Sequence, residues 1–129
     1  MASNEAAATA SMQTSDHDGV LVAVVSGELD MVSVDGIGTS LFGHLSEHPA
    51  GLIVDLAVDF MGSSALSMLL ELYGRSQREG VGFAIVATQP AAVRPMTASA
   101  LSQVLPLTDS VEGAMKLIRE ELKSGDKPA

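Results

Sequence analysis

Three nearly continuous runs of apolar residues alternate with stretches of helical spacing, and this alternation most constrains the fold of the chain. The runs lie at residues 20–25, 52–56 and 83–87 and are rich in Val, Ile and Leu. Apolar runs without polar alternation are typical of strands that are covered on both faces. Strands that alternate with helices favour a mainly parallel sheet with right-handed crossovers. The sequence therefore predicts a single α/β domain.

Each helix between these strands is predicted to bury one stripe of side chains. The first helix begins after a capping serine, Ser33, and stops before Pro49. The second runs from residue 64 to about residue 78, with Glu71 and Arg75 spaced for an ion pair. The stripes expected to face the core are Val34, Ile37, Leu41 and Leu45 in the first helix, and Leu66, Leu69, Leu70 and Tyr73 in the second.

The C-terminal third is predicted to add a short helix, an edge strand and a last helix. The short helix spans residues 90–101 and is kinked or shortened by Pro95. The edge strand covers residues 104–107, where Pro106 cannot donate to a ladder. A capping box at residues 109–112 opens the last helix. The residues that this helix is expected to bury are Val111, Ala114, Met115, Ile118 and Leu122.

These elements predict a sheet of four to five strands with about four helices. The domain itself is placed at residues 19–122. Residues 1–18, rich in Ala, Ser and acid, are expected to be a flexible tail or to add a weak edge strand around residues 11–15. Residues 123–129 are expected to form a C-terminal tail.

Composition excludes several classes of function. The chain has no Cys, which excludes disulfides, thiolate catalysis and cysteine-ligated zinc. The net charge is −9 and the first basic residue is Arg75, so a phosphate-binding face is not expected and direct nucleic-acid binding is disfavoured. Neither a signal peptide nor an apolar run long enough to span a membrane is visible. A cytoplasmic protein fits these features.

The join between the second strand and the second helix carries two adjacent serines. Ser63 is predicted to be the N-cap, and Ser64 to lie in the first turn with its hydroxyl near solvent. Because a helix N-terminus tolerates added negative charge, this turn suits a serine that is modified or contacted by a partner. The simpler alternative is that both serines only cap the helix.

The loops at the carboxyl ends of the strands are the expected place for a site. These loops are residues 27–30, 57–64 and 88–92. Met31, Met61 and Met68 flank them, and exposed methionines make an adaptable docking surface.

Other chemistries fit the sequence less well. The serine turn lacks the Gly-x-Ser-x-Gly spacing of a nucleophile elbow. His44 and His48 are spaced to clip a metal, but a zinc site needs at least three protein ligands. Asp30, Asp55 and Asp59 could gather at the strand ends and bind Mg²⁺, although a cap, a strand acid and a turn acid are the expected roles.

Four motifs in order resemble the STAS domain, in particular the stand-alone anti-sigma factor antagonists of bacteria. The first is residues 21–30, which end in Gly-Glu-Leu-Asp, and the second is residues 52–66 with the twin serines. The third is residues 90–94, Pro-Ala-Ala-Val-Arg, and the fourth is residues 107–114. The resemblance covers about residues 20–122 and implies the STAS fold.

What the resemblance implies is a regulatory binding protein rather than an enzyme. Its partner would be an anti-sigma factor kinase that uses Mg-ATP to phosphorylate Ser64, or less favourably Ser63, and a serine phosphatase would reset it. The antagonist itself would need no cofactor, nucleic acid or membrane, and would be a monomer or weak dimer. The residues expected to contact the partner are Glu28, Leu29, Asp30, Met31, Met61, Gly62, Ser63, Ser64, Ala65, Ser67 and Met68.

Two departures from the family pattern keep other functions open. The family has Asp before the serines and Gly after them, where this chain has Gly62 and Ala65. A lost carboxylate at Gly62 would weaken phosphotransfer or alter the choice of kinase. The alternatives are a ligand-sensing or scaffold STAS module that takes no phosphate, and a weak nucleotide-binding or hydrolytic activity that depends on Asp30.

Overall fold

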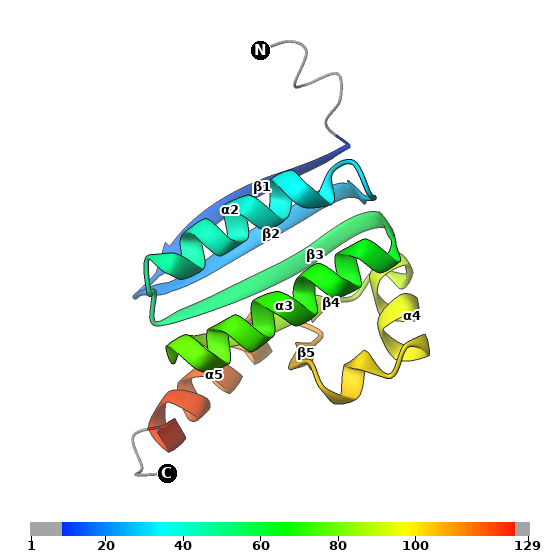
Figure 1. Cartoon of the computed structure of the whole chain (residues 1–129). Coiled ribbons are helices and arrows are strands. Elements are labelled where there is room, and N and C mark those ends of the chain that lie inside the picture. Colours follow the sequence, from blue (N-terminus) through cyan, green and yellow to red (C-terminus); the bar gives the residue numbers. More distant parts are fainter. Residues whose placement is uncertain (1–8, 126–129) are drawn as a thin grey trace.

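The strands and helices follow one another in the predicted order (Figure 1). The computed structural model describes residues 9–125, in which five strands form one sheet. The strands are β1 (Ala10–His17), β2 (Val20–Leu29), β3 (Gly51–Met61), β4 (Gly82–Ala87) and β5 (Leu107–Thr108). The helices are α2 (Val34–Ser46), α3 (Ser63–Glu79), α4 (Pro90–Ala98), the short 3-10 helix η1 (Leu101–Gln103) and α5 (Val111–Gly125).

The sheet is mainly parallel, as the sequence predicts. Its strand order is β1-β2-β3-β4-β5, and β2 to β5 run parallel to one another. Only β1 runs antiparallel, to β2. Because the parallel strands all end at the same edge, the loops after β2, β3 and β4 lie at that edge.

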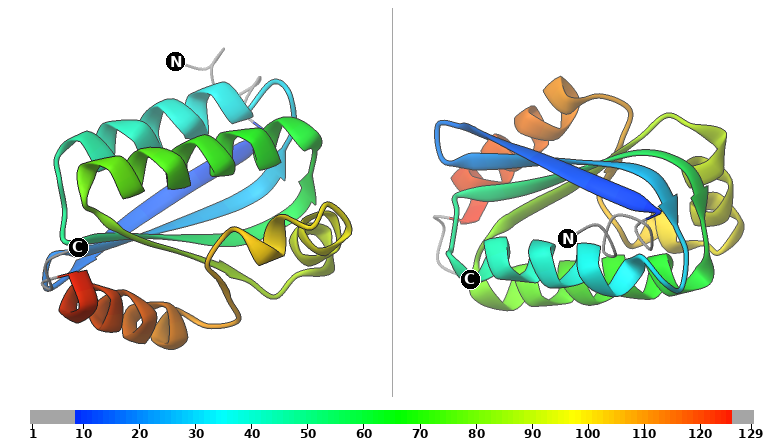
Figure 2. Two further views of the ribbon diagram at one scale, coloured as in Figure 1. Left: turned by 60° about the horizontal axis from the view of Figure 1, so that its bottom comes forward. Right: turned by 90° about the horizontal axis from the view of Figure 1, so that it is seen from above.

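Helices cover both faces of the sheet. Figure 2 shows α2 and α3 side by side on one face and α5 on the opposite face, with α4 at the end where the strands finish. The larger core lies under α2 and α3 and contains Val25, Leu41, Val54 and Leu72. The smaller core lies under α5, where Ile118 packs on the sheet.

Two strand glycines make room for α5. A Cβ added at Gly51 would lie 2.8 Å from Ile118 Cγ2, and one added at Gly82 would lie 2.9 Å from it. Ile118 is fully buried between these positions, and burying such a side chain stabilises the fold by about 1.5–3 kcal/mol. The two glycines thus let one isoleucine anchor the single helix on this face.

Strand β1 is longer than the weak edge strand expected at residues 11–15. It is joined to β2 by a two-residue turn, in which Asp18 has φ 57° and Gly19 has φ 91°. Positive φ at both positions matches the right-handed twist of a hairpin. Of the two alternatives given for residues 1–18, residues 10–17 therefore form the edge strand and not the tail. Residues 1–8 lie outside the described part.

Strands β2 and β3 also extend further than predicted. Most of the loops expected at residues 27–30 and 57–64 are strand, up to Leu29 and Met61. Gly27 has φ 93° inside β2, and a Cβ there would lie 2.4 Å from the Thr9 carbonyl oxygen. The glycine is needed for close approach to the start of β1 rather than for a turn.

The buried stripe of α2 is confirmed, whereas that of α3 is confirmed only in part. Helix α3 buries Ala65, Met68, Leu69, Leu72 and Ser76, and of the predicted set Leu66 and Tyr73 are half-buried against the core. Leu70 is instead among the exposed apolar side chains of the molecule. The Ser76 hydroxyl donates a 2.7 Å hydrogen bond to the Tyr73 carbonyl, which explains how a serine is fully buried here.

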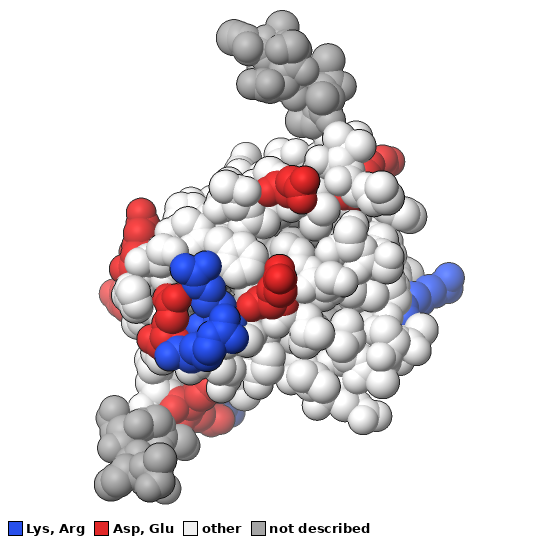
Figure 3. Space-filling view, viewed as in Figure 1, with Lys and Arg blue, Asp and Glu red and all other residues white. Residues whose placement is uncertain are grey.

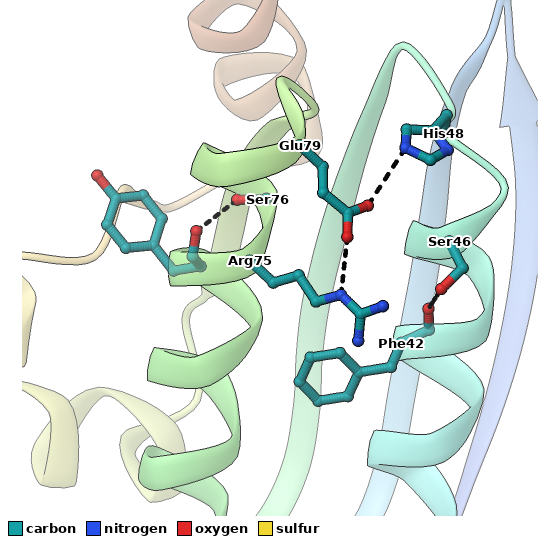
Figure 4. Close-up of polar contacts among 7 residues, drawn as sticks. Phe42, Ser46, His48, Arg75, Ser76 and Glu79 are labelled. Atoms are coloured by element: carbon teal, nitrogen blue, oxygen red, sulfur yellow. Dashed lines mark hydrogen bonds and ion pairs between the residues drawn. The ribbon is translucent and has the colours of Figure 1, made fainter.

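A polar cluster joins the last turns of α2 and α3, as Figure 4 shows. Arg75 Nε lies 2.8 Å from Glu79 Oε2, so the predicted pair with Glu71 is wrong. Glu79 Oε1 lies 3.4 Å from His48 Nε2, and the Arg75 guanidinium lies 5.6 Å from the centre of the Phe42 ring. The hydrogen bond from Arg75 lowers the pKa of Glu79. The cluster fixes the two helices at the end remote from the serines.

The C-terminal helices and strand begin or end at other residues than predicted. Helix α4 contains Pro95 and ends at Ala98, and η1 follows. Strand β5 is only two residues long. Ser110, not the predicted Asp109, caps α5, because its Oγ accepts a 2.9 Å hydrogen bond from the Gly113 N–H.

Helix α5 reaches residue 125, so residues 123–125, which were expected to belong to a C-terminal tail, are helical. Leu122, which was expected to be buried, is 38% exposed. Residues 126–129 lie outside the described part. None of the helices described is long and apolar enough to cross a membrane.

Two glycine substitutions should move stability in opposite directions. We expect Gly27→Ala to destabilise the fold by about 1–3 kcal/mol, because the alanine would be held at positive φ against the Thr9 carbonyl. Gly43→Ala should stabilise it by up to about 1 kcal/mol, because a Cβ there meets nothing within 4 Å and alanine favours a helix. Urea unfolding followed by circular dichroism measures both, and equal effects would contradict the assignment.

Candidate functional site

The carboxyl ends of β2 and β3 lie side by side, and the loops that leave them form one surface. The Gly62 N–H donates a 3.0 Å hydrogen bond to the Leu29 carbonyl. This bond joins the last residue of β2 to the residue before α3. The loop after β2 is thereby held beside the serine turn.

The loop after β2 is organised by the Asp30 carboxylate. Asp30 Oδ1 accepts hydrogen bonds from the N–H groups of Val32, at 3.0 Å, and Ser33, at 2.9 Å. The Thr9 hydroxyl also lies 3.2 Å from it. Hydrogen bonds to the charged form, first that from the Ser33 N–H, lower the pKa of Asp30. Ser33 begins α2 but donates its hydroxyl to the Glu28 carbonyl, at 2.6 Å, instead of capping the helix.

One extra residue in β3 changes which side chain faces outward. Gly27 lies opposite Val58, but the next residue, Glu28, lies opposite Phe60. Asp59 is therefore the extra residue of a β-bulge. Alternation along the strand would place Phe60 on the core side with Val58, and the bulge turns it away. The Phe60 ring is 50% exposed as a result.

The expectation that Met61 and Met68 are exposed is wrong. The same bulge turns Met61 into the core, where it is 5% exposed. Met68 is 8% exposed and packs on α2, since a Cβ at Gly38 would lie 3.2 Å from its Cγ. Leu29 and Ala65 are fully buried. Four members of the predicted contact set are therefore buried beneath this surface, namely Leu29, Met61, Ala65 and Met68.

The serine turn differs from the predicted cap. Gly62, in an extended conformation with φ −94°, is the N-cap of α3, and it makes no side-chain hydrogen bond. Ser63 is the first helical residue and is exposed, while Ser64 is the second and is half-buried. The structure shows no hydrogen bond from either hydroxyl within residues 9–125. Neither serine therefore caps the helix.

Apolar side chains gather around these serines. Met31 is 80% exposed, Val32 is 67% exposed and Phe60 is half-exposed, and we call these three residues the Phe60 patch. Exposed apolar groups that adjoin one another mark interaction sites. A pocket of about 380 Å³ opens here, lined by Asp30, Met31, Val32, Phe60, Gly62, Ser63 and Ser64. No lysine or arginine is among these lining residues.

The remaining members of the predicted contact set lie around this pocket. Glu28 is exposed beside Phe60 in the sheet. Ser67 is exposed one turn beyond Ser64, in a groove between α2 and α3. That the set contacts a partner stays a prediction.

Val32 and Phe60 were not in the predicted set. For Val32 the signal was present, since an apolar pair, Met31-Val32, follows a strand-ending Asp directly. Phe60 gave no such signal, because its spacing from Val58 is that of a buried position.

The other groups considered from the sequence do not form a catalytic or metal centre in the described residues. Asp30, Asp55 and Asp59 do not gather, and residues 9–125 contain no cluster of three metal-ligating side chains. Burial in the sheet raises the pKa of Asp55. His44 Nδ1 lies 3.8 Å from Glu47 Oε1, and His48 Nε2 lies 3.4 Å from Glu79 Oε1.

Comparison with known proteins identifies relatives. The family model of the STAS domain matches residues 11–114. The anti-sigma-F factor antagonist RsfB of Mycobacterium tuberculosis is 30% identical over 108 residues, which cover 81% of this chain and 85% of RsfB.

Solved structures agree with this match. The crystal structure of an anti-sigma factor antagonist from Mycobacterium paratuberculosis has a TM-score of 0.80 and 35% identity, and covers 85% of this chain and 94% of that one. The anti-sigma factor antagonist SpoIIAA, at 18% identity and a TM-score of 0.68 over 85% of this chain and 97% of its own, shares the fold.

The Asp30 carboxylate should stabilise the fold in a pH-dependent way. Because its pKa is lowered in the folded chain, its contribution is complete above the ordinary value of 3.8 and is lost as pH falls through the lowered value. We expect Asp30→Asn to be less stable than wild type at neutral pH, with the difference shrinking below about pH 4. Urea midpoints measured over this range, with Glu28→Gln as the neighbouring control, check this. A difference that does not change with pH would contradict the role assigned to Asp30.

Proposed function

This chain belongs to the STAS domain family, and from that premise we propose that it is an anti-sigma factor antagonist that is switched off by phosphorylation of Ser64. Its relatives are anti-sigma factor antagonists, and none of those compared above is named as an enzyme. The partner in this proposal is an anti-sigma factor of the serine-kinase class, which holds Mg-ATP, and a serine phosphatase removes the phosphate. The chain itself needs no cofactor, acts in the cytoplasm and is a monomer or weak dimer.

The Phe60 patch beside Ser64 is the observation that carries the proposal. Met31 and Val32 are 80% and 67% exposed, so two apolar side chains lie in water when no partner is bound. At about 25 cal/mol for each Å² of apolar surface, covering them would favour docking. The pocket they form contains both serine side chains. A partner that covers the patch would therefore lie directly on Ser63 and Ser64.

Ser64 is suitably placed to accept a phosphate. It is the second residue of α3, where the first N–H groups lack partners inside the helix and the helix dipole favours an anion. Its hydroxyl is unpaired within the described residues, and it lines the pocket. A phosphoserine here leaves the helix intact.

The switch follows from what surrounds the phosphate. A phosphate adds about −1.5 to −2 charges at neutral pH. The pocket offers apolar side chains and the Asp30 carboxylate, with no lysine or arginine among its lining residues. Docking would bury a dianion against apolar groups, which is strongly unfavourable without a cation to pair it. Phosphorylation should then release the partner.

Gly62 favours a second function, a STAS module that takes no phosphate. The carboxylate that the family carries at this position is missing here. Nothing in the fold forbids it, because Gly62 has negative φ and an added Cβ would lie 3.6 Å from the Phe60 ring, an ordinary contact. The chain would then sense a ligand or act as a scaffold. Gly62→Asp tests this alternative, since a phosphorylation substrate should accept label from Mg-ATP at least as fast with the carboxylate restored.

Ser64 substitutions should separate docking from phosphorylation. We expect Ser64→Ala to bind the cognate anti-sigma factor with wild-type affinity, and Ser64→Glu to bind about tenfold or more weakly, because the carboxylate is desolvated on docking. Isothermal titration calorimetry measures both. Ser40→Glu, which adds the same charge on the exposed side of α2, is the matched control and should bind normally.

Incubation with labelled ATP identifies which serine is phosphorylated. Incubation with the kinase and Mg²⁺ should label wild type and Ser63→Ala but not Ser64→Ala. Label that persists in Ser64→Ala would move the phosphate to another residue. Binding without any label would favour the module that takes no phosphate.

A further inference from the structure

A second pocket lies on the other side of Phe60, between the end of β3 and the start of α4. Its volume is about 330 Å³, and its lining residues are Asp59, Phe60, Met61, Pro90, Ala91, Arg94 and Pro95. Phe60 also lines the pocket with the serines. The half-exposed ring is thus a common wall, and the two pockets form one continuous surface across the carboxyl ends of β2 and β3.

The two halves of this surface differ in their charged groups. On the β2 side, Glu28 and Asp30 are both acidic. On the α4 side, the Asp59 carboxylate lines the pocket together with Arg94, which is exposed and has no ion pair within the described residues. Figure 3 shows a basic side chain at the edge of the molecule where α4 lies, well apart from the basic cluster over the C-terminal half of α3.

The backbone on the α4 side of the surface is restrained by two prolines. Pro90 occupies the first turn of α4, where its fixed φ suits the helix, and Pro95 lies inside the helix. Because Pro95 has no N–H, it cannot donate the usual helical bond to the Ala91 carbonyl. Ala91 and Pro95 both line the pocket. Two prolines with fixed φ therefore restrain the backbone on this side of the pocket.

We propose that this pocket is the second half of the docking surface, and that Arg94 binds an acidic side chain of the anti-sigma factor whose apolar neighbour rests on Phe60. The inference rests on the proposed function and adds the partner's chemistry and orientation to it. An acid at the Arg94 end and a basic or neutral group at the Asp30 end is the complementary arrangement. A partner turned around would place its acidic side chain beside Glu28 and Asp30, where like charges repel.

A second copy of this chain fits the surface less well. Each copy carries a net charge of −9, so two copies repel one another as they approach. An anti-sigma factor with an acid at one position of its contact surface meets no such general barrier. The surface is therefore assigned to a different protein.

Charge reversal at Arg94 tests the proposal. With the serine-kinase anti-sigma factors of the host as purified probes, Arg94→Glu should weaken binding to the cognate one about tenfold or more, and Arg94→Lys should keep most of the affinity. Arg119→Glu on α5 makes the same charge change on an exposed residue of the opposite face and should bind normally. Phe60→Ala should weaken binding at constant fold, checked by circular dichroism.

The partner side completes the test. Surface Asp and Glu residues of the anti-sigma factor are replaced by Lys one at a time. One of these variants should bind Arg94→Glu more tightly than the unaltered anti-sigma factor does. If wild type binds and Arg94→Glu binds equally well, or if no reversal restores affinity, this inference is overturned while the antagonist function stands. If no anti-sigma factor binds wild type, the proposed function itself fails. A dimer of wild type that is lost in Arg94→Glu would assign the surface to a second copy and also overturn the inference.

Discussion

The hydrogen bond from the Gly62 N–H to the Leu29 carbonyl holds together the part of the molecule on which the proposed function depends. It continues the pairing of β2 and β3 one residue beyond the sheet, so the Asp30 loop and the serine turn cannot move independently. Both flanking side chains, Leu29 and Met61, are buried, which fixes the backbone from the core side. Surface residues of two loops thereby gain the rigidity of the sheet, and a partner would meet them with little ordering of the backbone.

The β-bulge at Asp59 lowers the stability of the fold but exposes the Phe60 side chain. A phenylalanine in a core position contributes about 1.5–3 kcal/mol through burial, and the bulge gives up part of this by turning Phe60 outward. It also replaces Phe60 in the core with Met61, whose flexible side chain fills irregular space. The bulge therefore keeps the core filled while presenting an aromatic ring between two pockets. Bulges commonly re-aim a side chain next to a functional site, and the geometry here fits that use.

The sequence predicted the layers of the fold better than the surface. The buried parallel strands were predicted correctly, because residues 20–25, 52–56 and 83–87 are almost entirely apolar and show no polar alternation. For β1 the sequence suggested no more than a weak edge strand at residues 11–15, although Asp18-Gly19 is a strong turn signal, because the polar residues before the turn resembled a tail. The buried face of α3 was predicted only in part, because the helix also buries Ala65 and Leu72 and leaves Leu70 exposed. Phe60 and Met61 were beyond prediction, since periodicity along a single strand cannot reveal an extra residue relative to its neighbour.

The Asp18-Gly19 turn has a consequence at the far end of its hairpin. By fixing the register of β1 on β2, it brings Thr9 to the Asp30 carboxylate, at the edge of the Phe60 patch. Helix α5 runs to the opposite end of the sheet, where Leu122 lies near Gly82. A fluorescent or affinity tag fused ahead of Thr9 would consequently crowd the proposed docking surface, whereas the same tag fused after α5 would leave it open. The polarity of one antiparallel strand thus decides at which terminus this protein tolerates a label.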